Sequence, residues 1–262
     1  MFESLFEKQK YTRIIFFDTE TTGFEPDKDD QIIELAALSV TSDGEEGSID
    51  EFISLEVKPE LPSKITELTG ITGFDLAMKG ISEKDAMEKF INLAFPWIDP
   101  KNLFERLDRR TLLVAHNAQF DLLFMAYALI RQRDKGNGKG WEKPGGTNWL
   151  NEFSNADYLD TLTVYRDRHS FPHKLQNAIE YYGLADKVQN THRAIDDCHA
   201  LYEVTKAMDA ERDDLAGYIN LFGYPRKYGV SGKKFKKVTY LEQEYTNYSG
   251  KTLPEQLARR SQ

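Results

Sequence analysis

The order of short apolar runs along the chain is the feature that most constrains its fold. Three runs rich in β-branched and aromatic residues come first, and turn-forming residues separate them. Runs of this kind, bounded by Gly, Asp and Ser, predict strands joined by short connections, so we expect a β-meander. The predicted strands are residues 13–18, 31–40 and 49–57, and the predicted turns are residues 23–30 and 42–47.

Strand and helix patterns alternate in the second part of the chain. Ser82 can cap a first helix, and Asn117 can cap a second whose apolar interior must be buried. Three strands followed by this alternation predict an α/β fold with a mixed five-stranded sheet and helices on both faces. The predicted strands are residues 111–115 and 156–160, and the predicted helices are residues 82–97, 117–131, 161–168, 173–182 and 193–210.

Length and composition limit the class of protein. A chain of 262 residues with 40% hydrophobic residues predicts one or at most two soluble domains. No apolar run approaches the ~20 residues that a bilayer span needs, and residues 1–11 lack the apolar segment of a secretory signal. Cys198 is the only cysteine, which excludes an intramolecular disulfide and a thiolate zinc site. We therefore expect a cytoplasmic protein without a membrane partner.

Charge is unevenly distributed along the chain. The net charge is -9, but residues 223–262 carry nine bases and three acids, so this tail is +6 and the rest is -15. The tail is either a basic footprint for a polyanion or a solvated surface segment. Residues 132–150 hold five glycines, one proline, Trp141 and Trp149, a pattern that indicates an insertion within one domain.

Acidic residues interrupt the apolar patterns at three places, and the first directly follows the first strand. If the extended backbone continues through the sequence DTETTG, Asp18 and Glu20 point to one face and Thr19 to the other. Two carboxylates then project side by side from the end of a strand. A solvated turn without function is the alternative interpretation of this short pattern.

The second and third places lie on predicted helices. Asp121 shares a helical face with Phe124, Met125 and Ala128, so it is carried toward the core. The alternative is an acid stabilised by the helix dipole, worth about 0.3 to 1 kcal/mol. Asp197 likewise shares a face with apolar residues, whereas Asp196 is the solvated acid of that pair. An inward carboxylate requires a cation, a buried Arg or a proton.

Four inward carboxylates in one domain would repel one another unless divalent cations neutralise them. Two Mg²⁺ or Mn²⁺ ions carry the matching charge, and ligands that are all oxygen favour these hard ions over zinc. Paired cations suit an in-line displacement at phosphorus. His192 precedes the third acidic site and is a natural base for an attacking water, although a lone histidine is more often a surface or capping residue.

Three motifs resemble, in order and spacing, the exonuclease motifs of the DEDDh family. They are FDTETTG at residues 17–23, AHNAQFD at 115–121 and HRAIDD at 192–197. The likeness is greatest to the epsilon-like proofreading exonucleases of bacterial DNA polymerase III and extends over residues 13–208. All five signature positions are intact. Further similarity lies in IIEL at 32–35, ITELTGIT at 65–72 and DTLTVYR at 160–166.

The resemblance implies a ribonuclease-H-like fold, which agrees with the strand and helix pattern. It also implies a role for each signature residue, with Asp18 bridging two ions and His192 acting as general base. The implied metal ligands are Asp18, Glu20, Asp121 and Asp197, and the implied cleft residues near the terminal nucleotide are Thr19, Thr21, Thr22 and Asn117.

Several polar residues near the motifs have less defined roles. Glu34 either supports the metal ligands from behind or is a satisfied strand acid. We expect Asp160 to be structural. His116 and His173 are expected to be core or capping residues, with His173 facing the substrate as the alternative.

The activity implied is a metal-dependent 3′→5′ exonuclease that releases nucleoside 5′-monophosphates from DNA, preferring single strands. An RNA exonuclease uses the same chemistry, and no residue pattern here reads the 2′-hydroxyl. A binding subunit of a polymerase or repair assembly is a further alternative, which the intact acids and His192 disfavour.

The domain division that follows is an N-terminal extension at residues 1–12, an exonuclease domain at 13–210 and a basic C-terminal extension at 211–262. The basic tail could contact phosphates or dock a protein partner. Trp141 and Trp149 could stack on bases or pin the insertion to the body.

Overall fold

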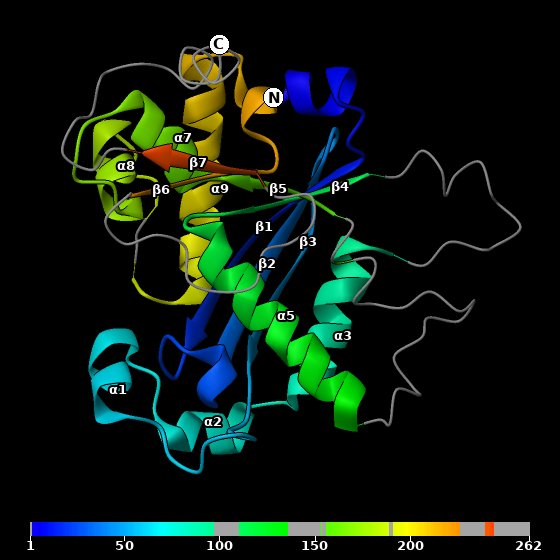
Figure 1. The fold of residues 1–262 in the computed structure, drawn as a ribbon, viewed down its shortest axis with the longest axis vertical. Coiled ribbons are helices and arrows are strands. Elements are labelled where there is room, and N and C mark those ends of the chain that lie inside the picture. Colours follow the sequence, from blue (N-terminus) through cyan, green and yellow to red (C-terminus); the bar gives the residue numbers. More distant parts are fainter. Residues whose placement is uncertain are drawn as a thin grey trace, which may run out of the picture.

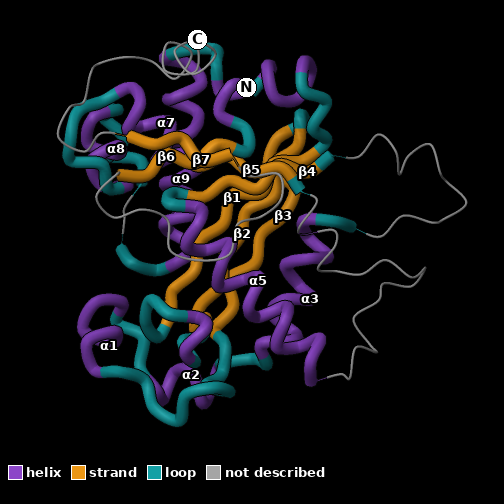
Figure 2. Tube along the Cα trace, in the orientation of Figure 1, coloured by secondary structure: helices purple, strands orange, loops and turns teal. Residues whose placement is uncertain are grey.

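The computed structural model describes residues 2–96, 110–135, 153, 156–188, 191–225 and 239–243. Its centre is a mixed sheet with the strand order β3-β2-β1-β4-β5 (Figure 2). The first three strands form the predicted antiparallel meander, and β4 and β5 add to it in parallel with β1. The strands are β1 (Arg13–Thr21), β2 (Ile32–Thr41), β3 (Gly44–Phe52), β4 (Thr111–Ala115) and β5 (Asp157–Asp160).

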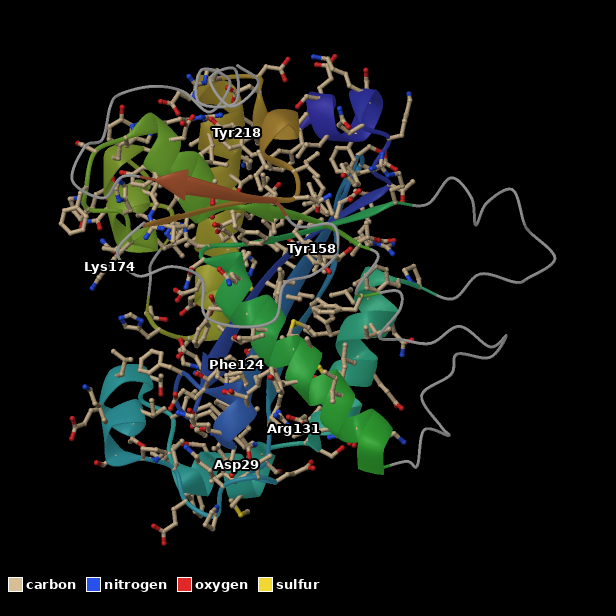
Figure 3. All side chains as sticks on the ribbon, viewed as in Figure 1. Asp29, Phe124, Arg131, Tyr158, Lys174 and Tyr218 are labelled. Carbon is tan, nitrogen blue, oxygen red and sulfur yellow. The ribbon has the colours of Figure 1, made fainter. Side chains whose placement is uncertain are left out.

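Helices cover both faces of this sheet, as the pattern predicts (Figure 1). Because side chains alternate along a strand, Ile14 and Phe16 of β1 pack in one core cluster and Ile15 and Phe17 in another. The first cluster includes α7 (Thr161–Arg168), α8 (Leu175–Tyr181) and α9 (Ala194–Glu211), and the second includes α3 (Glu83–Ala94) and α5 (Ala118–Lys135). Figure 3 shows how side chains such as Phe124 of α5 and Tyr158 of β5 fill these layers.

The third strand begins and ends five residues earlier than predicted. β3 covers Gly44–Phe52 instead of residues 49–57, because a tight turn follows β2 directly and Gly44, at φ +122°, starts the return strand. The first half of β3 is polar and lies at the edge of the sheet, so it pairs with β2 without contributing an apolar run.

The helices agree with the sequence prediction more closely. Ser82 caps α3, because its hydroxyl accepts the N–H of Asp85. The helix predicted over residues 117–131 continues to Lys135, so the start of the predicted insertion is helical. Elements that the apolar pattern did not predict are η1 (Ser4–Lys8), η2 (Pro26–Lys28), α1 (Ser63–Thr69), α2 (Gly73–Lys79) and η3 (Leu215–Tyr218).

Residues on both sides of the predicted exonuclease domain pack into its core. Phe2 and Leu5 are fully buried in the cluster that contains α9, and Leu215 and Tyr218 join the same cluster. Beyond them, β6 (Leu221–Pro225) and β7 (Thr239–Gln243) pair in parallel as a separate two-stranded sheet. Residues 136–150, with Trp141 and Trp149, and most of the basic tail lie outside the described residues. Within the described part, no helix has the length and apolarity to cross a bilayer.

Candidate active site

The acids predicted to project from the first strand do so because β1 stays extended as far as Thr21. Asp18 pairs across the sheet with Ala36, and Glu20 pairs with Glu34 of β2. Alternation directs Asp18, Glu20 and Glu34 to the face that α9 covers and Thr19 to the face that α5 covers. The sheet therefore gathers three carboxylates at one end of the neighbouring strands β1 and β2.

Asp121 is joined to β1 through Thr19. Asp121 lies in the first turn of α5 and is only 3% exposed. The backbone N–H of Thr19 donates to Asp121 Oδ1 at 3.1 Å, and the Thr19 hydroxyl donates to the same oxygen at 2.7 Å. Burial raises the pKa of Asp121 well above its usual value, the charge of Asp18 adds to this, and the Thr19 hydrogen bonds oppose it. Thr19 thus fixes the start of α5 against the acidic end of β1.

Asp197 is the inward acid of its pair, as helical spacing predicts. It lies in the first turn of α9 at 6% exposure. Asp196 is half-buried and accepts a hydrogen bond from the Thr191 hydroxyl at 2.6 Å. Asp197 Oδ1, in contrast, is buried and has no hydrogen-bond partner among the described residues. A buried carboxylate oxygen without a donor is costly, and a cation is one species that would satisfy it.

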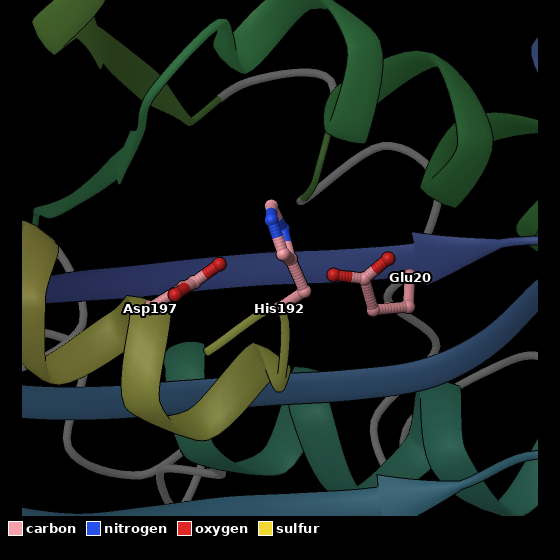
Figure 4. A group of neighbouring side chains, drawn as sticks. All are labelled: Glu20, His192 and Asp197. Atoms are coloured by element: carbon pink, nitrogen blue, oxygen red, sulfur yellow. The ribbon is translucent and has the colours of Figure 1, made fainter. Parts of the chain in front are cut away.

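His192 lies between two of the acids. A ring nitrogen of His192 and carboxylate oxygens of Glu20 and Asp197 all lie within 4.8 Å of one another. Figure 4 shows the two carboxylates on either side of the imidazole, each pointing toward it. The His192 side chain is exposed, and its backbone is left-handed at φ 58°. Strained backbone of this kind, in a residue other than Gly or Asn, is often found at functional sites.

Burial and mutual repulsion raise the pKa of each of these acids. Burial, with the charge of Glu34, raises the pKa of Asp18 to about 7. Burial and the nearby Asp18 and Asp197 raise the pKa of Glu20 to about 9, and burial and Asp18 raise that of Asp197 to about 8. Without cations, burial and repulsion thus favour the protonated forms of these carboxyls. Oxygen ligands, mutual repulsion and the unpartnered Asp197 Oδ1 together fit hard divalent cations.

Glu34 is a satisfied buried acid with a positioning role. It is fully buried and accepts hydrogen bonds from Arg193 Nε at 2.8 Å and from the Ala194 N–H at 3.0 Å. Arg193 Nη2 lies 2.6 Å from Glu34 Oε1, and its guanidinium stacks 4.9 Å from the Phe52 ring centroid. Both interpretations of Glu34 therefore apply: it is satisfied, and it fixes the start of the helix that carries Asp197.

The three threonines predicted to line the cleft have buried side chains. The hydroxyl of Thr19 bonds to Asp121, that of Thr21 donates to the Gly23 carbonyl, and that of Thr22 donates to Asp30. These contacts shape the loop after β1. Of the four predicted cleft residues, only Asn117 has an exposed side chain.

Asp160 is structural, as expected, and it organises two helix starts. Its Oδ1 accepts the N–H groups of Asn117 and Ala118 at the start of α5, and that of Leu162 in the first turn of α7. Its Oδ2 accepts the Thr163 hydroxyl at 2.6 Å. Asn117 itself is left-handed at φ 72°, so Asp160 supplies the acceptor that we expected from an Asn117 cap.

Two groups near the acids were not singled out from the sequence. Phe24 is 83% exposed directly after the TTG turn, and its ring packs edge-on against Phe120 at 6.2 Å. A second group lines a pocket beside Asn117 and includes Arg166, Phe171 and Lys174. An aromatic residue after a glycine turn was the available sequence signal for Phe24. Arg166, Phe171 and Lys174 come from one stretch of the chain, but their position beside Asn117 depends on the tertiary fold, so no local pattern marks the pocket.

Comparison with known proteins agrees with this geometry. Residues 15–97 and 99–205 match the model of the exonuclease family. The DNA polymerase III PolC-type protein of Clostridium perfringens is 32% identical over 196 residues, which are 73% of this chain and 11% of that protein. The chain thus spans about a tenth of the length of this relative. The DNA polymerase III subunit epsilon of Treponema pallidum is 26% identical over 220 residues, 83% of this chain and 86% of that one.

A shorter match is to ribonuclease T of Buchnera aphidicola, 30% identical over 129 residues, which are 47% of this chain and 56% of that protein. Among solved structures, E. coli exonuclease I in complex with single-stranded DNA has a TM-score of 0.57 at 19% identity, covering 79% of this chain and 42% of that one. The nuclease domain of 3'hExo, a DEDDh family member bound to rAMP, has a TM-score of 0.54 at 18% identity, covering 77% and 92%. These structural likenesses support the ribonuclease-H-like fold.

A mixed sheet of this topology, with acids gathered at the end of its first strand, defines the class of ribonuclease-H-like nucleases. The matched family model and relatives define the member more closely. The chain belongs to the exonuclease family and carries an exonuclease domain of the DEDDh type.

Proposed function

We propose that this protein hydrolyses DNA stepwise from the 3′ end and releases nucleoside 5′-monophosphates, with two divalent cations, Mg²⁺ or Mn²⁺, as cofactors. The observation that carries the proposal is the meeting of Glu20, His192 and Asp197 at the end of β1, with Asp18 and Asp121 close enough to raise the pKa values of their neighbours. Four signature acids from three distant segments thus act on one another electrostatically, and His192 lies beside two of them.

Asp18, Glu20, Asp121 and Asp197 would hold the cations. Bound there, the cations would supply Lewis acid activation of water and stabilise charge on the leaving oxygen. His192 has an exposed ring beside the acids, so it can accept a proton from the attacking water and pass it to solvent. Thr19 positions Asp121, and the Glu34–Arg193 ion pair positions the start of α9. The exposed Asn117 and Phe24 are proposed to contact the terminal nucleotide.

Single-stranded DNA is the proposed substrate. Relatives named as DNA polymerase III proteins, and the fold shared with an exonuclease bound to single-stranded DNA, support it. A second candidate is RNA trimming, which the match to a ribonuclease T favours. We also propose that the basic tail docks a polymerase or repair protein, in line with the PolC and epsilon relatives.

We assign catalysis to residues 13–210, with the packed residues on either side as support. The cytoplasm is the proposed compartment, because the single cysteine, Cys198, is buried and free.

Product analysis tests the proposal. A 5′-labelled single-stranded DNA, the same sequence as RNA, and a DNA with a recessed 3′ end are incubated with Mg²⁺, Mn²⁺ or EDTA. We expect a ladder that shortens from the 3′ end of DNA, mononucleotide products, and no reaction in EDTA or with Asp18→Ala. Equal activity in EDTA would refute the metal requirement. Degradation of the RNA but not of the DNA would show that RNA is the substrate instead of DNA.

A further inference from the structure

A positively charged pocket lies beside the acid cluster and is separate from it. Its volume is about 300 Å³, and Asn117, Leu162, Arg166, Phe171, His173 and Lys174 line it, with His116. None of these lining residues is acidic, although the whole chain has a net charge of -9. Figure 3 shows Lys174 extending outward from the segment before α8. The lining therefore has the charge to attract an anion, although the protein as a whole is acidic.

Its histidines form a rigid wall with little positive charge. His116 Nε2 lies 2.9 Å from the His173 carbonyl oxygen, and His173 Nε2 lies 3.0 Å from that of His169. A carbonyl oxygen only accepts, so Nε2 of each ring carries a proton and donates it. Burial lowers the pKa of both rings, and Arg166 lowers them further. The charge of the pocket therefore comes from Arg166 and Lys174.

An aromatic ring completes the pocket. Phe171 is 71% exposed and packs edge-on against His173, with ring centroids 5.8 Å apart. A largely exposed ring beside two cationic side chains suits a nucleotide, whose base can stack on the ring while its phosphate meets the cations. A free phosphate would use the cations but not the ring.

The sheet topology places the pocket and the acids along the same edge of the sheet. β1, β4 and β5 are parallel neighbours, so their carboxyl ends lie at one edge of the sheet. The acids lie at the end of β1, Asn117 follows β4, and α7 with Arg166 follows β5. Adjacent strands are about 4.8 Å apart, so the pocket lies roughly 10 Å along this edge from β1. A neighbouring nucleotide of a bound strand can reach it.

We propose that this pocket binds the nucleotide on the 5′ side of the scissile phosphate, an inference that rests on the proposed exonuclease function. The 3′-terminal nucleotide of a strand contains one phosphate, which is the scissile one and belongs at the acids. The cations of the pocket therefore meet a second phosphate, and that phosphate lies upstream. Lys174 and Arg166 hold it, and Phe171 stacks on the attached base.

The test compares two substrates of different length. The 5′-p-nitrophenyl ester of thymidine monophosphate contains only the terminal nucleotide, whereas a single-stranded decamer also fills the upstream pocket. The variants are Lys174→Gln and Phe171→Ala. Matched controls are Lys187→Gln, an exposed lysine outside the pocket lining, and Phe74→Ala, a ring on α2 that is 73% exposed. Circular dichroism and melting temperature check that each variant is folded.

For each pocket variant we expect kcat/KM on the decamer to fall about fivefold or more, and hydrolysis of the ester to stay within twofold of the unsubstituted protein. Lys174→Gln should also reduce the slope of log kcat/KM against log salt concentration by about 0.7. Equal losses on both substrates would overturn the proposal, because the pocket would then serve the terminal nucleotide. Decamer rates equal to those of the controls would overturn it as well.

A failure of the proposed function would look different. The unsubstituted protein would then hydrolyse neither substrate in Mg²⁺ or Mn²⁺. Fluorescence anisotropy of a labelled decamer in Ca²⁺ would still test the pocket, with weaker binding by Lys174→Gln and Phe171→Ala than by the controls as the expected result. Unchanged affinity there would overturn the pocket on its own.

Discussion

Removing one acid of the cluster should stabilise the protein when cations are absent, even though it destroys the proposed activity. Asp197→Asn is the sharpest such change, because the amide has the size of the carboxylate and carries no charge. Burial and Asp18 raise the pKa of Asp197 from 3.8 to about 8. The folded protein therefore binds a proton that the unfolded chain has released, and its stability falls as pH rises from about 4 to about 8.

The expected gain in the free energy of unfolding follows from the pKa shift of Asp197. Four pKa units at ~1.4 kcal/mol each set an upper bound of about 6 kcal/mol at pH 8. Side-chain movement and water entry raise the effective dielectric constant, which brings the expected gain to roughly 2 kcal/mol. For a domain of this size, 1 kcal/mol corresponds to about 2 to 4 °C in Tm. We therefore expect Asp197→Asn to melt about 4 to 8 °C higher at pH 8 in EDTA.

Differential scanning fluorimetry from pH 4 to pH 9, with EDTA or 10 mM Mg²⁺, measures this effect. Mg²⁺ should raise the Tm of the unsubstituted protein more than that of Asp197→Asn, and the difference between the two proteins should shrink toward pH 4. Asp196→Asn is the control, since Asp196 lies in the same turn of α9 and has a hydroxyl partner in Thr191. A variant no more stable than the unsubstituted protein in EDTA at pH 8 would refute the reasoning.

Three further changes test the neighbouring groups, and Glu46→Gln is the control for the second of them. His192→Ala should lower kcat on DNA by about 10² to 10⁴, while Mn²⁺ affinity by calorimetry and oligonucleotide affinity stay within about twofold; similar losses in all three would contradict a base. Glu34→Gln keeps one acceptor oxygen but removes the charge that pairs with Arg193 at a fully buried position, and it should cost about 1 to 3 kcal/mol in urea unfolding. Glu46→Gln breaks an ion pair with a half-exposed acid and should cost less than 1 kcal/mol, so equal costs would contradict the burial argument. Thr19→Val removes the hydroxyl donor to Asp121 and should cost about 1 to 3 kcal/mol with reduced kcat, and an unchanged kcat would separate Thr19 from the site.

The sequence was most informative where local periodicity decides a side chain's direction. Alternation along β1 and the spacing on α9 predicted which way Glu20 and Asp197 would point, because burial depends there on the element's own geometry. The strand at residues 111–115 and the helix at 161–168 were predicted at their observed bounds for the same reason. A local sequence pattern is sufficient to predict the bounds of an element and the direction of its side chains when burial on one or both faces determines the pattern.

Features that depend on distant contacts were outside the reach of such patterns. Glu34 and Arg193 are 159 residues apart, so nothing in either segment alone predicts their ion pair. The edge strand beginning at Gly44 is polar where it pairs, so its position depends on a turn and on β2 instead of on burial. The bond from the Thr19 hydroxyl to the Asp121 carboxylate likewise depends on the packing of α5 against β1. Tertiary geometry, and not propensity, decides all three.

Asp160 joins two parts of the molecule that are otherwise distinct. One carboxylate receives donors from the start of α5, which leads to Asp121, and from the start of α7, which leads to Arg166. Asp160→Ala would remove the oxygen that accepts from both segments, and both helix starts would lose their common anchor together. A single substitution at this buried residue would thus impair cation capture and strand affinity at once.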